Sequence, residues 1–195
     1  MLAFRTRNTA KIYCLIVIGV ALASCAFHAP NKYHDANTDF STLHNIAVLP
    51  FTNLTEDQLA AERVRNTFMT ALLSTGVVYV IPAGEVARAI SRAEIQNPTA
   101  PSTDDIAKIA AILKADAIIT GVLREYGAVR SGTTTANVIS VSMEMIEKET
   151  RKIVWSANTT QGGISIWDRL FGGGGRPMND VTEAAVNDLI KKLLR

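Results

Sequence analysis

Four consecutive glycines, Gly172 to Gly175, form the segment of this sequence that most resembles a ligand-binding loop. A phosphate-binding loop has the pattern GxxxxGK[ST] directly after a strand, because its lysine and hydroxyl meet the phosphate and the metal. Here Arg176 and Pro177 follow the glycines, so the Gly-Lys pair is missing. A dinucleotide fingerprint would need a further glycine where Pro177 stands. The sequence therefore predicts no nucleotide and no other cofactor at this run.

The segment just before the glycines combines large apolar side chains with an arginine: Ile164, Ile166, Trp167, Arg169, Leu170 and Phe171. Tryptophan and arginine are the residue types that dominate the energetics of protein interfaces. Two interpretations remain open. These side chains form an interaction loop for a partner, or they fold back and complete the core of their own domain. In both cases Gly172, Gly173, Gly174 and Gly175 act as a hinge that supplies backbone freedom, not a ligand.

The positions of cysteine and histidine exclude several kinds of catalysis. Beyond His44 the sequence contains no histidine and no cysteine. A Cys–His nucleophile, a Ser–His–Asp triad and a zinc site built from His or Cys are therefore unavailable after His44. We expect no metal site there.

Acidic pairs are the last candidates for chemistry: Glu56 with Asp57, Asp104 with Asp105, and Glu147 with Glu149. The first two pairs lie at predicted helix starts, where capping and first-turn acids are common. The third lies in a predicted polar turn. A hydrolase would need acids that converge in a cleft. An envelope hydrolase stays as an alternative, but we expect no enzymatic activity.

Residues 1–24 have the layout of a bacterial lipoprotein signal peptide. Basic residues precede an apolar run from Ile12 to Ala23, which is short for a membrane-spanning helix. The run ends in Leu-Ala-Ser-Cys25, which resembles a lipobox, the motif in which the cysteine is acylated and the bond before it is cut. This resemblance implies a lipid anchor on Cys25. In similar lipoproteins an Asp in the next position commonly signals retention in the inner membrane. Ala26 stands there in this sequence, so the same resemblance implies the outer membrane, with the protein facing the periplasm.

The net charge gives no reason to expect a nucleic-acid partner. The sequence has 20 Lys and Arg against 18 Asp and Glu, a formal charge of +2. Three of these basic residues, Arg5, Arg7 and Lys11, belong to the segment predicted to be removed. The remaining chain is close to neutral, so no basic footprint for nucleic acid is left.

For the rest of the chain, the sequence predicts a lipidated cysteine and flexible tether over 25–44 and one α/β domain over 45–195. The tether is polar and lacks a helical or strand period. We expect strands over 46–51, 77–81, 117–126, 139–145 and 153–160, and helices over 55–75, 85–95, 102–113 and 177–193. This β-α-β-α-α-β-β-β-α order predicts a single three-layer-like domain with a mixed sheet. The first two strands should be parallel and the last two an antiparallel hairpin.

Three short motifs resemble a family of periplasmic lipoproteins. Asn45 to Thr55 (NIAVLPFTNLT) is similar to the family's "(I/V)AVLPF.N.T" start, Lys114 to Gly121 to its "ADyvltG" strand, and Ile153 to Ser156 to its "G.ivWs" strand. The family is the CsgG-like group, which includes curli-secretion channels, LpoB-like activators of penicillin-binding proteins and the DUF799 (GNA1162-type) lipoproteins. The resemblance implies an anticodon-binding-domain-like fold, which is a statement about shape and not about RNA.

Channel activity is not expected from this chain. In curli-type channels two hairpins of the domain cross the outer membrane, and their equivalents here are the segments 127–136 and 162–178. A membrane-crossing hairpin needs roughly twenty residues with alternating apolar positions. The first segment is short, small and polar, and the second is interrupted by Asp168, Arg169 and the glycines. The sequence predicts that neither crosses a membrane.

These observations predict a lipid-anchored binding or scaffolding protein of the cell envelope, at the outer membrane. Its contacts would be the membrane, through the lipid on Cys25, and an envelope protein or a second copy of itself, through the loop around Trp167. One alternative is a homo-oligomeric component of a curli-type secretion apparatus. The other is the envelope hydrolase.

Overall fold

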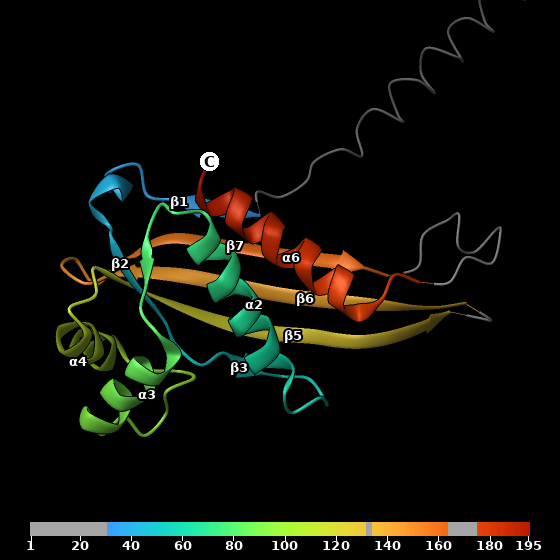
Figure 1. The fold of residues 1–195 in the computed structure, drawn as a ribbon, viewed down its shortest axis with the longest axis horizontal. Helices are drawn as coiled ribbons and strands as arrows, with labels where there is room; N and C mark the ends of the chain where they lie inside the picture. The colour runs from blue at the N-terminus through green and yellow to red at the C-terminus, as the bar shows by residue number, and fades with distance from the viewer. Residues whose placement is uncertain (1–30, 132–133, 164–174) are drawn as a thin grey trace, which may run out of the picture. The chain divides into compact units, whose positions relative to one another are not determined.

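The computed structural model describes residues 31–131, 134–163 and 175–195 (Figure 1). Met1–Asn31 and Lys32–Arg195 are separate units, and the second holds the elements described below. In chain order the strands are β1 (Lys32–His34), β2 (Asn45–Val48), β3 (Thr52–Asn53), β4 (Tyr79–Val80), β5 (Ala117–Ser131), β6 (Thr134–Glu147) and β7 (Ile153–Gly162). The helices are the 3-10 turn η1 (Phe40–Thr42), α2 (Ala60–Ser74), α3 (Ala83–Arg92), α4 (Thr103–Leu113) and α6 (Met178–Leu193).

The strands form one mixed seven-stranded sheet in the order β1-β7-β6-β5-β2-β4, with β3 paired to β5. β2 is parallel to both β4 and β5. β5, β6 and β7 are antiparallel neighbours. The predicted mixed sheet, the parallel pairing of the first two long strands and the final antiparallel hairpin are therefore confirmed.

Helices cover the two faces of the sheet and enclose two apolar cores. The larger core lies under α2 and α6, and its largest fully buried side chains include Trp155 and Phe68. The smaller core lies under α3 and α4, around Leu49, Ile109 and Ile118. Figure 1 shows α2 and α6 lying along β5, β6 and β7, with α3 and α4 gathered at the end where β2 and β4 lie. The predicted three-layer α/β domain is confirmed.

The β5–β6 hairpin is longer than its sequence suggests. We expected a loop over 127–136, but β5 continues to Ser131 and β6 begins at Thr134, with Gly127 opposite Val138 and Val129 opposite Ala136. The small side chains give no alternating pattern, yet they allow the ladder of backbone hydrogen bonds to continue. A strand that is stabilised by its neighbour need not show amphipathic alternation.

The start of the folded domain is also earlier than predicted. The expected tether reached residue 44, but Lys32–His34 pairs with β7 and η1 follows it. Asp39 caps η1 by accepting a hydrogen bond from the Ser41 backbone N–H. A three-residue strand is too short to give a periodic signal, so the sequence could not reveal it.

Two helix starts differ from the expected ones. α2 begins at Ala60 and not at residue 55, because Thr55 is held in a turn by the side chain of Asn53. α6 begins at Met178, one residue after the expected start, and Pro177 makes no side-chain capping bond. A capping box, formed by Ser102 and Asp105, holds the start of α4.

Candidate interaction surfaces

The motif residues hold the fold together. Phe51, in the first motif, packs directly on Gly121 in β5. A Cβ atom added to Gly121 would lie 2.7 Å from the Phe51 ring, closer than any real Cβ contact. Only glycine fits there, so two motifs that are 70 positions apart in the chain meet in one contact.

Asp116, in the second motif, stabilises the other end of β2. Its Oδ2 accepts hydrogen bonds from the backbone N–H groups of His44 at 2.9 Å and Asn45 at 2.7 Å. Those donors lie at the start of β2, and Asp116 thereby ties that end of the strand to the start of β5. The third motif supplies Trp155, which is fully buried in the larger core. The three motifs are therefore a signature of folding, and surfaces for partners must be sought elsewhere.

Five of the six acidic candidates, all but Glu56, are engaged in caps, turns or ion pairs. Asp57 accepts a hydrogen bond from the Leu59 backbone N–H and pairs with Arg63 at 2.7 Å. Asp104 pairs with Arg151 at 3.1 Å. The hydrogen bonds that the Ser102 side chain and backbone donate to Asp105 lower the pKa of that carboxyl.

Glu147 is the last residue of β6, and Glu149 lies in the turn that leads to β7. The Thr150 hydroxyl donates a hydrogen bond to Glu147, and Lys148 pairs with Glu149 at 3.3 Å. Within the described ranges, no three or more His, Cys, Asp or Glu side chains are grouped so that they could hold a metal ion. Asp57, Asp104, Asp105, Glu147 and Glu149 are therefore each held in a cap, a turn or an ion pair.

The predicted interaction loop lies outside the described residues, and so do Cys25 and three of the four hinge glycines. This applies to Ile164, Ile166, Trp167, Arg169, Leu170 and Phe171, and to Gly172, Gly173 and Gly174. Their roles stay predictions. Gly175 is described, and a Cβ there would lie 2.6 Å from the Ala136 Cα. Close approach to β6 thus gives Gly175 a packing reason to be glycine, besides the predicted freedom.

The base of the loop is held on β6 by Asn137. Its backbone carbonyl accepts a hydrogen bond from the Gly163 N–H at 2.8 Å, and its side-chain Nδ2 donates to the Arg176 carbonyl at 2.8 Å. Gly162 lies against the same residue with φ +85°, and a Cβ there would be 2.1 Å from the Asn137 carbonyl oxygen. Both ends of the loop are therefore fixed at one point of the sheet. No sequence signal pointed to Asn137.

An apolar groove lies between α2 and β4, at the opposite end of the sheet. Its volume is about 360 Å³, and no charged side chain lines it. The lining residues are Asn66, Met69, Thr70, Leu73, Val80 and Pro82. Leu73 remains 54% exposed beside it. Because β4 is the last strand on this side of the sheet, the groove opens along a sheet edge. We call it the α2–β4 groove.

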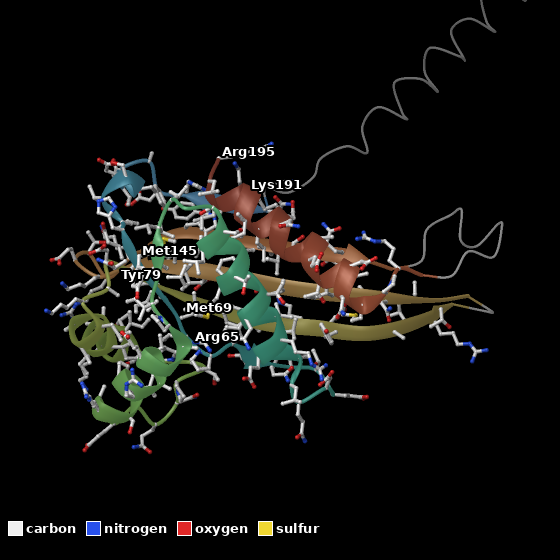
Figure 2. All side chains as sticks on the ribbon, viewed as in Figure 1. Arg65, Met69, Tyr79, Met145, Lys191 and Arg195 are labelled. Atoms are coloured by element: carbon white, nitrogen blue, oxygen red, sulfur yellow. The ribbon has the colours of Figure 1, made fainter. Side chains whose placement is uncertain are left out.

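Arg65 fills the position at which open α/β sheets often bind ligands. The connection after β2 runs over one face of the sheet and the connection after β4 over the other, which creates a crevice at their carboxyl ends. The Arg65 guanidinium lies there and donates to the Val48 carbonyl oxygen from Nε at 3.1 Å and Nη2 at 2.6 Å. Burial lowers the pKa of Arg65, while the charge of Glu62 raises it. Figure 2 shows Arg65 and Met69 on the same side of α2.

A comparison with protein-family models decides the family. Residues 29–160 match the model described as the peptidoglycan-synthase activator LpoB, which is more than half of the chain. The chain belongs to this family. The match spans all three motifs and confirms the predicted LpoB-like resemblance. It ends before the segment that contains Trp167 and before α6. A search of curated proteins finds no significant match.

Solved structures share the fold of this LpoB-family chain. The PelC dodecamer of Paraburkholderia phytofirmans is 19% identical, with 83% of this chain and 94% of that chain covered and a TM-score of 0.54. Lipoprotein GNA1162 from Neisseria meningitidis is 18% identical, with coverages of 77% and 98% and a TM-score of 0.56. At these identities the likeness shows the fold alone.

Family membership supports a role in the cell envelope through protein contact, since an activator acts on another protein. Among the described residues, no helix is long and apolar enough to cross a membrane.

Proposed function

We propose that this LpoB-family chain is a lipid-anchored protein of the outer membrane that faces the periplasm and acts by binding another envelope protein. The observation that carries the proposal is the match of residues 29–160 to a family of synthase activators. The anchor would be the lipid on Cys25, and the contact would be made by the interaction loop around Trp167 and Phe171. The engagement of Asp57, Asp104, Asp105, Glu147 and Glu149 in caps, turns and ion pairs supports an activity based on contact and not on chemistry.

The base of the loop supports its role in binding. Preorganised attachment lowers the entropy that a binding segment loses on contact. Asn137 fixes both ends of the loop by two hydrogen bonds of 2.8 Å. Large apolar side chains next to such a base would be presented at a defined place on the domain.

Self-association is a second candidate function. PelC, which shares the fold, is a dodecamer. A homo-oligomer of this chain would be the form that the curli-type alternative requires.

Crosslinking in the native envelope tests the contact. We expect Trp167→Ala combined with Phe171→Ala to leave the unfolding transition unchanged and to abolish partner capture or oligomerisation. The matched control is Leu54→Ala combined with Ile153→Ala, which removes two exposed apolar side chains elsewhere and should leave capture intact. Loss of folding in the loop variant would instead return Trp167 and Phe171 to the core and contradict the proposal.

Palmitate labelling tests the anchor. The wild type should incorporate the label and Cys25→Ala should not. Equal labelling of both proteins, or of neither, would contradict the anchor.

A further inference from the structure

The α2–β4 groove and the base of the interaction loop lie at opposite ends of the sheet. Val80 pairs with Ile46, Ile46 with Ala117, and Ala117 with Glu147, so these residues form one row across the sheet. Asn137, at the loop base, lies ten positions along β6 from Glu147. Ten strand residues span about 33 Å. Figure 1 shows β4 and the turn end of the β5–β6 hairpin far apart along the longest axis.

The loop of one chain is too short to reach its own groove. Twelve Cα-to-Cα steps lead from Gly163 to Gly175, and both ends are fixed near Asn137. A fully extended chain gains at most about 3.5 Å per step, so the loop can extend about 21 Å from its base before it must return. The Val80 end of the groove lies beyond that limit, because the distance along β6 alone exceeds it. Asn66, at the other end of the groove, also lines a hollow with Tyr126 and Asn179, nearer the loop base.

The groove and the loop have matching chemistry. The groove is uncharged and has room for an aromatic side chain, at the small end of the roughly 300–1,000 Å³ typical of binding pockets. The loop brings Trp167 and Phe171, and its Asp168 and Arg169 have opposite charges. A nearly neutral, aromatic segment can therefore enter the groove without leaving a net charge in an apolar site.

We infer that the α2–β4 groove of one copy receives the Trp167 loop of a second copy. Since the two surfaces lie at opposite ends of the domain, each copy offers a loop to one neighbour and a groove to the other. Such a head-to-tail contact is heterologous, and it closes into a ring when the rotation between copies allows. The inference rests on the proposed function in using the same loop, and it names a second copy as the partner.

The test uses two full-length copies with different tags, produced together in the envelope. One copy carries Leu170→Cys in the loop and the other Thr70→Cys in the groove. Mild oxidation should give a mixed-tag disulfide dimer. A control pair replaces Thr70→Cys with Ser156→Cys, in β7 and away from the groove, and should give little product. A yield for the groove pair no higher than for this control would overturn the inference.

A substitution in the groove gives an independent measurement. Leu73→Glu places a carboxylate beside the groove and should lower the yield of mixed-tag dimer at least about tenfold, which corresponds to about 1.4 kcal/mol. Leu54→Glu, on a residue that is 64% exposed elsewhere, should leave the yield unchanged. An unchanged yield with Leu73→Glu would contradict docking in the groove.

The same variants separate this inference from the proposed function. One outcome is that Trp167→Ala abolishes capture of an envelope protein, while Leu73→Glu and the Thr70→Cys pair show no contact between copies. In that case the inference fails and the proposed function stands. The loop could instead enter lipid. Leu170→Cys would then be protected from a water-soluble maleimide while no mixed-tag dimer forms, and this result would also overturn the inference. If the loop variants change neither capture nor crosslinking, both fail.

Discussion

His34 Nε2 donates a hydrogen bond of 2.7 Å to the carbonyl oxygen of Lys192, 158 positions further along the chain. Trp155 Nε1 donates to the same oxygen at 3.3 Å. This carbonyl is in the last turn of α6, where the backbone carbonyls have no N–H donor within the helix. The strand β1 is thereby fastened to the C-terminal helix, and the chain that would lead to the lipid joins the domain at Lys32.

The first prediction follows from that bond. His34→Leu keeps an apolar contact with Phe40, whose ring centre is 5.1 Å from the His34 ring, but removes the donor. The loss should lower the free energy of unfolding by about 0.5–1.5 kcal/mol. Urea denaturation followed by circular dichroism measures it. Lys32→Ala, on an exposed side chain of the same strand, is the control and should change little. Equal midpoints for His34→Leu and the wild type would refute a stabilising role.

The second prediction concerns the contact between Phe51 and Gly121. Gly121→Ala should destabilise the domain by about 1–3 kcal/mol, because the new methyl group overlaps the ring and the strand cannot move away. Gly84→Ala is the matched control, since the nearest side-chain atom to a Cβ there is 3.8 Å away. It should leave stability unchanged or raise it by up to about 1 kcal/mol. When Phe51→Leu is combined with Gly121→Ala, the double variant should recover part of the lost stability. If the losses of the two single variants simply add in the double variant, the overlap between the methyl group and the ring is contradicted.

The sequence predicted the long elements because their apolar patterns are set by the cores. The run from Ile46 to Phe51 lies between two helical layers, and the helical spacing of Val64, Phe68 and Leu72 matches the buried face of α2. The order of elements followed from these patterns. Short paired elements were missed for a physical reason. β1 and the outer half of the β5–β6 hairpin are fixed by backbone pairing with neighbours, which leaves no periodic trace in the side chains.

The candidate site was predictable only in part. The unusual apolar composition next to the glycines marked the interaction loop. Its anchoring by Asn137 depends on residues 26 and more positions apart and has no local signature. The α2–β4 groove likewise depends on how α2 packs against β4. Arg65 did carry a signal, since it lies four positions after Ala61 and three before Phe68 on an otherwise apolar helix face.

The third prediction concerns Arg65. In β2, the carbonyl of Ile46 accepts a hydrogen bond from the Ile81 backbone N–H, just after the end of β4. Val48 lies two residues further along β2, and its carbonyl accepts hydrogen bonds from the Arg65 side chain. Arg65→Met should leave that carbonyl without these donors and cost about 1–3 kcal/mol of unfolding free energy. Arg63→Met, which removes an exposed ion pair with Asp57, should cost about 0–1 kcal/mol. Similar losses for both variants in guanidinium denaturation would show that the Val48 bonds contribute little.

The fourth prediction concerns acid stability at Asp188. Burial on its own would raise the pKa of this carboxyl, but the hydrogen bonds from Lys192 and Thr159 and the charges of Lys192 and Lys191 outweigh it and lower the pKa. Lys192 Nζ lies 2.6 Å from the Asp188 Oδ2, and Thr159 Oγ1 lies 2.7 Å from the same atom. A carboxyl whose folded pKa is lowered stabilises the fold above its unfolded pKa of about 3.9. That contribution disappears as the pH falls through the lower, folded value.

Asp188→Asn should therefore reduce stability at pH 7 and make little difference below the lowered, folded pKa of Asp188, because the wild-type carboxyl is then also neutral. Urea denaturation of both proteins across this range measures the shrinking gap. Thr159→Val removes one of the two donors and should raise the Asp188 pKa, so its acid transition should begin at a higher pH than in the wild type. A gap between wild type and Asp188→Asn that stays constant from pH 7 to the acid limit would mean that the Asp188 carboxylate does not stabilise the fold through its charge.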